Sequence, residues 1–501
     1  MVYEFRNQPW FGLYVAYQLV TTTLFRLPFW YAVSYPQSWR PRPSWSLKRA
    51  VLVRLFRHLY SITQKTGPLT TPPTHRAIRP GPGIKAVWVD PCPHLITGPL
   101  LTLAIAANVS CARIPGYWID RDASLPAGAP PQPNDKLLYR LHGGAYIQLS
   151  AHPSDPTANI ARGMLRHCPS LTRTFAVEYR LSSARPYEDA NPFPAALVDA
   201  LAGYRYLVED VGFSPRDIVV LGDSAGGNLA LALVRYLRDS QPPSPASGGQ
   251  QGREYVHTHA GGYPQVHVVP THLPTPLPLP HALVLLSPWT DLSTSHAGPN
   301  SSLARSYASD YTLSSSPSSS SSSSLLSPLL ALLPPLRPLL ALAHTRTRTH
   351  TDAAPNTHLP LRASYPKHAF LGPLGTGFAA HSVYVSPACL GPFVAPHATF
   401  GGFPRTWVCA GGAEPLVDSI RTLWWRMERD LGRGCGGAGD VDAEQVEGAD
   451  VDADGEGERW TGGVVYYEAE DALHDHVLFP WHEPEVGETL RRVARWLEWG
   501  W

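Results

Sequence analysis

The sequence predicts an α/β protein in which an open, mainly parallel sheet is covered by helices on both faces. From Lys136 onward, short runs rich in apolar and β-branched residues alternate with stretches of helical periodicity. This alternation is typical of parallel strands joined by helices. Apolar residues make up 44% of the 501 residues, which is enough for a sizeable core. The formal net charge of +1 provides no long-range field, so nucleic acid is not an expected partner.

The sequence predicts the following strands and helices. The expected strands are the runs LLYRLHGG, FAVEYR, residues 218–221, ALVLLSP, TWVCAGG and VVYYEAE. Helical spacing of apolar residues predicts helices over residues 194–210, 225–237 and 415–431.

Three segments interrupt this alternation and are expected to be surface insertions. Residues 240–280 are rich in Pro, Gly, His and Gln, and residues 314–365 are rich in Ser, Leu and Pro. Residues 432–458 are rich in Gly and acidic residues. The last contains DVDADGEGE, which matches the first half of a calcium-binding loop. Thr461 stands where such a loop needs a bidentate glutamate, so a solvated acidic loop is favoured. The six cysteines form no C-x-x-C pair, and neither a metal nor a cofactor is expected.

The N-terminal segment leaves two alternatives open. Residues 11–25 carry no charge, but they are fewer than the roughly 20 needed to span a bilayer. LKRAVLVRLFRHLYSI follows, and helical spacing separates its apolar and basic side chains. The apolar face contains Val51, Leu55, Phe56, Leu59 and Ile62, and the basic side contains Lys48, Arg49, Arg54 and Arg57. These helices either dock on the domain or bind a membrane through residues 8–33, with the endoplasmic reticulum as the candidate compartment.

A nucleophile is predicted within VVLGDSAGGNLALAL. Gly222, Asp223, Ser224, Ala225 and Gly226 form the pattern G-x-S-x-G between a predicted strand and a predicted helix. A serine at such a sharp turn needs small neighbours, and the turn lifts its hydroxyl above the sheet. The alternative is an ordinary serine in a glycine-rich turn.

Groups that hold a developing oxyanion are predicted in LHGGAY, which directly follows a strand. Acyl transfer needs preorganised backbone N–H donors, and glycines let the backbone approach a substrate closely. Gly143 and Gly144 are therefore the expected donors, together with Ala225. His142 is expected to brace this loop rather than to act as a base.

The general base is sought after the last predicted strand, where DALHDHVLF contains His474 and His476. We favour His474, because Val477, Leu478 and Phe479 begin the next element. The alternative is that His474 is a buried structural histidine.

These motifs, together with EYRLSSARPYEDANPFPAALVDA, SPWTDLS and GGAEPLVDS, resemble the hormone-sensitive-lipase-like branch of α/β-hydrolases, also called the α/β-hydrolase fold-3 family. The resemblance spans about residues 137–479. It implies a carboxylic-ester hydrolase that needs no metal, with residues 1–120 forming a hydrophobic segment and cap and residues 121–501 the hydrolase domain. It also implies Ser224 as nucleophile, His474 as base, and Gly143, Gly144 and Ala225 as the oxyanion hole.

Three carboxylates are candidates for the third member of the triad, which must lie between serine and histidine in the chain. Asp291 follows the preceding strand, and Asp418 lies in the first turn of a helix, where the helix dipole alone favours an acid. Glu414 directly follows the glycines that end a strand, and Pro415 suits the first helical position. We favour Glu414, although the resembling branch usually has aspartate there.

The sequence therefore predicts a serine esterase or lipase-like hydrolase of a lipophilic small-molecule ester, with an acyl-enzyme intermediate. Amide or peptide hydrolysis by the same residues is one alternative. A ligand-binding protein without catalysis is another. The oligomeric state is left open.

Overall fold

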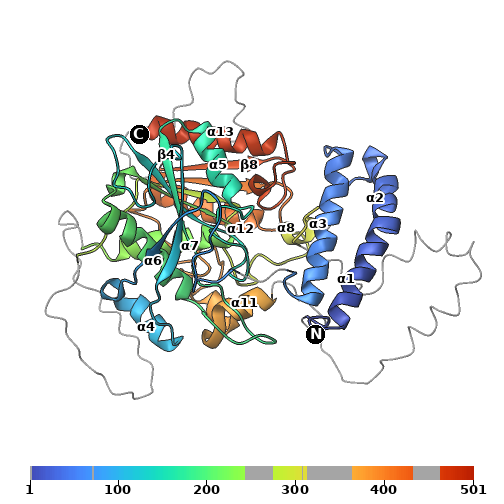
Figure 1. Cartoon of the computed structure of the whole chain (residues 1–501), viewed down its shortest axis with the longest axis horizontal. Helices are drawn as coiled ribbons and strands as arrows, with labels where there is room; N and C mark the ends of the chain where they lie inside the picture. Colours follow the sequence, from blue (N-terminus) through green and yellow to red (C-terminus); the bar gives the residue numbers. More distant parts are fainter. Residues whose placement is uncertain (1–2, 70–72, 243–274, 307–308, 313–363, 433–462) are drawn as a thin grey trace, which may run out of the picture.

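The computed structural model of the chain describes residues 3–69, 73–242, 275–306, 309–312, 364–432 and 463–501. At its centre is an eight-stranded sheet with the order β1-β2-β4-β3-β5-β6-β7-β8. β2 is antiparallel to β1 and to β4, and the remaining neighbours are parallel. Helices cover both faces of this sheet (Figure 1), so the predicted α/β class is confirmed.

The bounds of the elements are as follows. The strands are β1 Lys85–Val89, β2 Ile114–Asp120, β3 Lys136–Leu141, β4 Leu171–Val177, β5 Ile218–Asp223, β6 Ala282–Leu286, β7 Arg405–Gly411 and β8 Val464–Ala469. The helices around the sheet are α4 Gly98–Ala106, α5 Ala158–His167, α6 Ala195–Arg205, α7 Ala225–Asp239, α8 Ser302–Arg305, α11 Ser364–Leu371, α12 Val417–Leu431 and α13 Glu485–Gly500.

Alternate side chains of the central strands pack into two separate cores. In β5, Ile218 and Val220 join the core beneath α6, α7 and α12, whereas Val219 and Leu221 join the core beneath α5 and α13. Successive side chains of a strand point to opposite faces of the sheet. Because both faces are covered, these strands are continuous apolar runs, as buried parallel strands usually are.

The sheet extends further toward the N-terminus than expected. The strands predicted from Lys136 onward all form, but β1 and β2 come before residue 120 and pair into the same sheet. The sheet therefore begins at Lys85, within the N-terminal 120 residues that the sequence analysis assigned to the hydrophobic segment and cap. The antiparallel β2 pairs with β4 from Gly116 to Asp120, which ties this N-terminal ribbon to the parallel core.

An N-terminal hairpin of helices stands beside the α/β body (Figure 1). It consists of α1 Trp10–Thr21, a π-helical turn Thr22–Arg26, α2 Leu27–Ser34 and α3 Leu47–Thr66. Within the described residues, none of the helices combines the length and apolar character that crossing a membrane requires.

The face of α3 that packs on the body agrees with the predicted one only in part, since Phe56 lies against Phe479 and Trp481 as expected. Arg49, expected on the polar side, is buried and binds the Glu485 carboxylate through both terminal nitrogens at 2.7 and 2.6 Å. Leu59, expected on the apolar side, is 40% exposed. α3 therefore docks through an ion pair as well as through apolar side chains.

The three predicted insertions lie mostly outside the described residues, and the calcium-loop-like stretch at 450–458 lies wholly outside them.

Candidate active site

Ser224 lies at the sharp turn between β5 and α7. Its backbone is left-handed in φ (φ +51°, ψ −116°), a strained conformation of the kind that functional turns retain. The flanking glycines are required for space. A Cβ on Gly222 would lie 2.1 Å from the carbonyl oxygen of Gly226, and one on Gly226 would lie 2.0 Å from that of Leu141.

His474 lies on the loop after β8, with its imidazole against the serine. Its Nε2 is 2.9 Å from Ser224 Oγ, within reach for proton transfer. The backbone N–H of His474 donates to Asp310 Oδ2 at 3.0 Å, which fixes the loop. His476 instead contacts Thr489 through Nε2, and burial lowers the pKa of its imidazole to about 3. The structure thus brings together the serine and the histidine that the sequence favoured.

Glu414 is the carboxylate nearest to the second imidazole nitrogen. Its side chain is fully buried, and Oε2 lies 3.5 Å from His474 Nδ1. The backbone N–H of Gly411 also donates to this oxygen, at 3.2 Å. The separation exceeds an ordinary hydrogen bond, as is common in catalytic sites without substrate.

The other two candidate acids have different partners. Asp291 accepts hydrogen bonds from Ser293 N–H and Ser295 Oγ and lies 2.8 Å from Nδ1 of His296. Asp418 accepts from Ser302 N–H at 2.6 Å and pairs with Arg305. Both carboxylates are thus engaged away from His474, and Asp418 supports the start of α12 as its position in the first turn suggested.

The loop carrying Glu414 is held from outside by three serine hydroxyls at and after α8. Ser309, Ser306 and Ser302 donate to the carbonyl oxygens of Ala413, Glu414 and Pro415, at 3.2, 2.9 and 2.8 Å. Successive carbonyls of a loop are satisfied without water here. These hydroxyls therefore fix the backbone from which the Glu414 carboxylate projects.

The charge around His474 favours its protonated form. Burial lowers the pKa of this imidazole, but the carboxylates of Asp475 and Glu414 outweigh burial and raise it to about 10. Burial also raises the pKa of Glu414. Nothing in the sequence pointed to Asp475 except its place beside the histidine. Within the described part of the chain, no group of His, Cys, Asp or Glu side chains is arranged to hold a metal ion.

The candidate oxyanion donors are not equivalent. Gly144 adopts φ +102°, and a Cβ there would lie 2.1 Å from the carbonyl oxygen of Gln148, so only glycine is accommodated. Ala225 is the first residue of α7, where a backbone N–H has no acceptor within the helix. The N–H of Gly143 instead donates to Asp223 Oδ2 at 2.9 Å. Gly143 is therefore not a free donor, contrary to the prediction, and it serves to position the loop.

His142 braces the same loop. Its ring stacks on Tyr179 with 4.2 Å between centroids, and Nδ1 lies 2.8 Å from the Gly143 carbonyl oxygen. Burial, and then the nearby Arg140, lower its pKa to about 3. A neutral, buried histidine of this kind matches the bracing role expected from the sequence.

A mostly apolar cavity of about 220 Å³ opens over Ser224 and His474. Its lining includes Tyr60, Gly144, Ala145, Leu149, Trp289, Leu303, Tyr311, Pro366, Leu416, Asp475 and Leu478. Tyr60 belongs to α3, so the N-terminal hairpin contributes part of the wall.

A serine at a strand-to-helix turn, with an acid and then a histidine after later strands of this sheet, defines the α/β-hydrolase class of fold. Residues 138–347 match the sequence model of a family described as alpha/beta hydrolase fold. The matched segment makes up less than half of the 501 residues.

The matched relatives are similar over a limited part of their length. An acetyl-hydrolase of Streptomyces hygroscopicus is 39% identical over 118 residues, which are 24% of this chain and 36% of the relative. An esterase of Acinetobacter venetianus is 32% identical over 115 residues, 23% of this chain and 33% of the relative. The chain thus spans about a third of the length of these relatives.

A solved structure of an esterase from the bacterial hormone-sensitive lipase family is 18% identical, with a TM-score of 0.47, covering 91% of this chain and 99% of that one.

Proposed function

We propose that this protein is a serine carboxylic-ester hydrolase that acts through an acyl-enzyme intermediate. The observation that carries the proposal is the 2.9 Å contact between Ser224 Oγ and His474 Nε2 at the floor of an apolar cavity. The names of the similar relatives, acetyl-hydrolase and esterase, point to the same reaction.

The geometry supports a two-step mechanism. Ser224 Oγ attacks the ester carbonyl while His474 Nε2 takes its proton. The amides of Gly144 and Ala225 hold the oxyanion, and the Glu414 carboxylate stabilises the imidazolium from the Nδ1 side. His474 then protonates the leaving alcohol, and afterwards it activates the water that hydrolyses the acyl-enzyme.

The cavity favours a lipophilic ester with a short acyl group. Its volume of about 220 Å³ is smaller than that of typical drug-sized pockets, which hold about 300–1,000 Å³. Aromatic and aliphatic side chains such as Trp289, Tyr311 and Leu416 supply most of its wall. Removing apolar substrate surface from water is favourable, at roughly 25 cal/mol per Å².

The test is hydrolysis of p-nitrophenyl esters of increasing acyl length, with the matched p-nitroanilides alongside. We expect the acetate and butyrate esters to be the better substrates, and Ser224→Ala to lower kcat by a factor on the order of 10⁶. Full activity in that variant would overturn the mechanism. Anilides cleaved as fast as esters would instead assign an amidase, and the absence of turnover with any ester would assign a binding protein.

We further propose that the N-terminal hairpin associates with a lipid surface. Many large apolar side chains of α1, the π-helical turn and α2 are more than half exposed. They are Trp10, Leu13, Tyr17, Leu19, Val20, Leu24, Phe25, Phe29 and Tyr31. Exposed apolar patches of this kind mark interaction sites, and mixed aromatic and aliphatic side chains suit the interface of a bilayer.

Sedimentation with phosphatidylcholine vesicles tests this association. The double substitution Leu24→Glu and Phe25→Glu is expected to reduce the bound fraction several-fold and to leave ester hydrolysis in solution unchanged. The matched control is Leu390→Glu with Phe393→Glu, since these side chains are also more than half exposed but lie outside the hairpin. Equal binding of both variants would contradict the proposal without affecting the hydrolase mechanism.

A further inference from the structure

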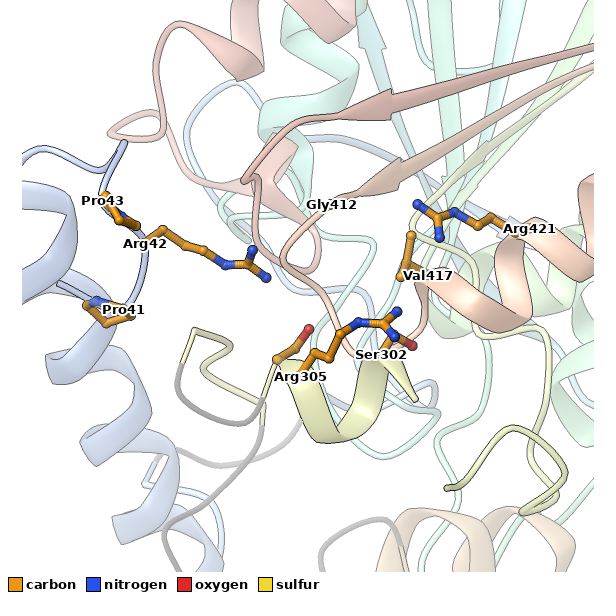
Figure 2. A pocket seen from close by; sticks show the side chains of 9 residues that line it. Pro41, Arg42, Pro43, Ser302, Arg305, Gly412, Val417 and Arg421 are labelled. Carbon is orange, nitrogen blue, oxygen red and sulfur yellow. The ribbon is translucent and has the colours of Figure 1, made fainter. Parts of the chain in front are cut away.

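A second and larger cavity, of about 560 Å³, lies where the N-terminal hairpin meets the α/β body (Figure 2). Its walls come from the turn between α2 and α3, from α8, and from the loop and first turns after β7. The lining residues are Pro41, Arg42, Pro43, Ser302, Arg305, Ser306, Gly412, Val417 and Arg421. It shares no lining residue with the cavity over Ser224, so it is a separate site.

Three arginines from three different elements line this cavity. Arg42 enters from the turn before α3, Arg305 from the end of α8, and Arg421 from α12, and Figure 2 shows their side chains around the same space. No carboxylate is among the lining residues. The nearest charges seen by a group inside the cavity are therefore positive.

Each arginine is held by an acid that stands outside the lining. Arg42 pairs with Asp471 at 3.3 Å, Arg305 with Asp418 at 3.1 Å, and Arg421 with Glu468 at 2.8 Å. Long arginine side chains are otherwise costly to order on binding. These ion pairs orient the guanidinium groups and reduce the repulsion between three like charges across the cavity.

Donor capacity remains after these pairs are made. A guanidinium carries five N–H donors, and a bidentate carboxylate occupies two of them. Arg421 holds Glu468 in this bidentate way, through Nε and Nη2. A ligand that uses the remaining donors must be an acceptor with several oxygens, and arginine is well suited to phosphoryl groups for this reason.

We propose that this cavity binds a phosphoryl oxyanion, carried either by a small phosphomonoester or by a phospholipid headgroup. A tetrahedral group presents its oxygens in different directions, as guanidinium groups from three elements require. The volume exceeds that of one phosphate and leaves room for the group that carries it. Because Gly412 and Val417 flank Glu414 in sequence, the bound oxyanion also stabilises the loop that presents this acid.

Binding of inorganic phosphate to the whole protein tests the site, measured by calorimetry against chloride at equal ionic strength. We expect saturable binding to phosphate, and at least a tenfold rise in Kd for Arg305→Gln and for Arg421→Gln. Arg429→Gln is the matched control, since Arg429 also lies on α12 and pairs with an acid, Asp430, yet does not line the cavity. Its Kd should stay within twofold of the wild-type value.

Two results would overturn the proposal: phosphate binding no stronger than chloride binding, or an unchanged Kd in the Arg305→Gln, Arg421→Gln double variant. The side chain of Arg305 is 54% exposed, so Arg305→Gln keeps the test valid if Arg421→Gln fails to fold. This proposal depends only on phosphate binding, so it can fail or hold whatever the outcome of the ester-hydrolysis test.

A second arm identifies the source of the phosphoryl group. Vesicles containing phosphatidic acid are compared with pure phosphatidylcholine vesicles, and glycerol phosphate is titrated separately. A gain on phosphatidic acid that Arg305→Gln abolishes assigns a lipid headgroup. Tight binding of glycerol phosphate without that gain assigns a soluble phosphomonoester.

Discussion

Asp475 Oδ2 lies 3.3 Å from Nε2 of His474, the same nitrogen that contacts Ser224 Oγ. The Asp475 side chain is buried, lines the active-site cavity, and has no acceptor or donor for Oδ1 among the described residues. With Glu414 at Nδ1, the imidazole therefore has a carboxyl group on each side. An arrangement of this kind stabilises the imidazolium that forms during acyl transfer.

The first prediction concerns the pH dependence of hydrolysis. Burial lowers the pKa of His474, but Asp475 and then Glu414 raise it to about 10. A general base must be neutral, so kcat/KM rises as the pH rises through this pKa. Asp475→Asn removes one of the two carboxylates, and the acidic limb of the kcat/KM profile should move by more than one unit toward the ordinary value near 6.5.

Asp291→Asn is the control for this profile, because Asp291 is engaged by His296. Its acidic limb should coincide with that of the wild-type enzyme. If the profile of Asp475→Asn also coincided with the wild-type profile, Asp475 would have no influence on the proton at Nε2.

The second prediction distinguishes the three candidate acids. Glu414→Gln keeps the shape of the side chain but removes the charge that stabilises the imidazolium, and loss of this charge in a triad can cost on the order of 10⁴ in kcat. Asp418→Asn and Asp291→Asn should each change kcat by less than about tenfold, since both acids have other partners. Steady-state kinetics on one ester decides the assignment, and near-normal turnover in Glu414→Gln would refute it.

The third prediction concerns the serines that hold the acid loop. Ser306→Ala removes the 2.9 Å hydrogen bond to the carbonyl oxygen of Glu414 and leaves a buried acceptor unpaired, at a cost of roughly 1–3 kcal/mol. We expect kcat to fall about tenfold with little change in KM, because displacement of the acid affects the transition state more than substrate binding.

Ser240→Ala provides the comparison, since Ser240 donates to the carbonyl oxygen of Tyr236 at the end of α7. It should lower the free energy of unfolding without changing kcat. If Ser306→Ala lowered only stability, this serine would be a structural support with no bearing on the position of Glu414.

The sequence was most informative where the chemistry depends on local backbone geometry. The turn at Ser224 requires glycines on both sides, so the motif and the structure agree in detail. The acid and the histidine follow ends of neighbouring parallel strands, β7 and β8, and such ends meet at one edge of a sheet. The sequence alone could therefore predict that three segments distant in the chain meet at one edge of the sheet.

Contacts between distant side chains could not be predicted in this way. Gly143 looked like a free donor, but its N–H is taken by Asp223, which the turn at Ser224 carries toward it. Asp475 reaches Nε2 of His474 with its own backbone in a left-handed conformation, at φ +51°. No pattern in the sequence predicts this conformation. The buried face of α3 depends on Glu485, which lies 436 residues away from Arg49.

The last prediction concerns how the N-terminal hairpin is attached. Burial tends to raise the pKa of Glu485, but hydrogen bonds from His482 and Arg49 lower it to about 2. A carboxyl group with a depressed pKa contributes stability that is fully present above its unfolded value near 4.5, and this contribution is lost as the pH falls toward 2. Docking of α3 should therefore weaken within this window.

Pepsin cleavage within α3 should accelerate between pH 4.5 and 2.5, and Arg49→Gln should make α3 sensitive to chymotrypsin already at neutral pH. Lys48→Gln is the matched neighbour on the exposed side and should behave as wild type, whereas equal cleavage of the two variants would show that apolar packing alone holds the hairpin.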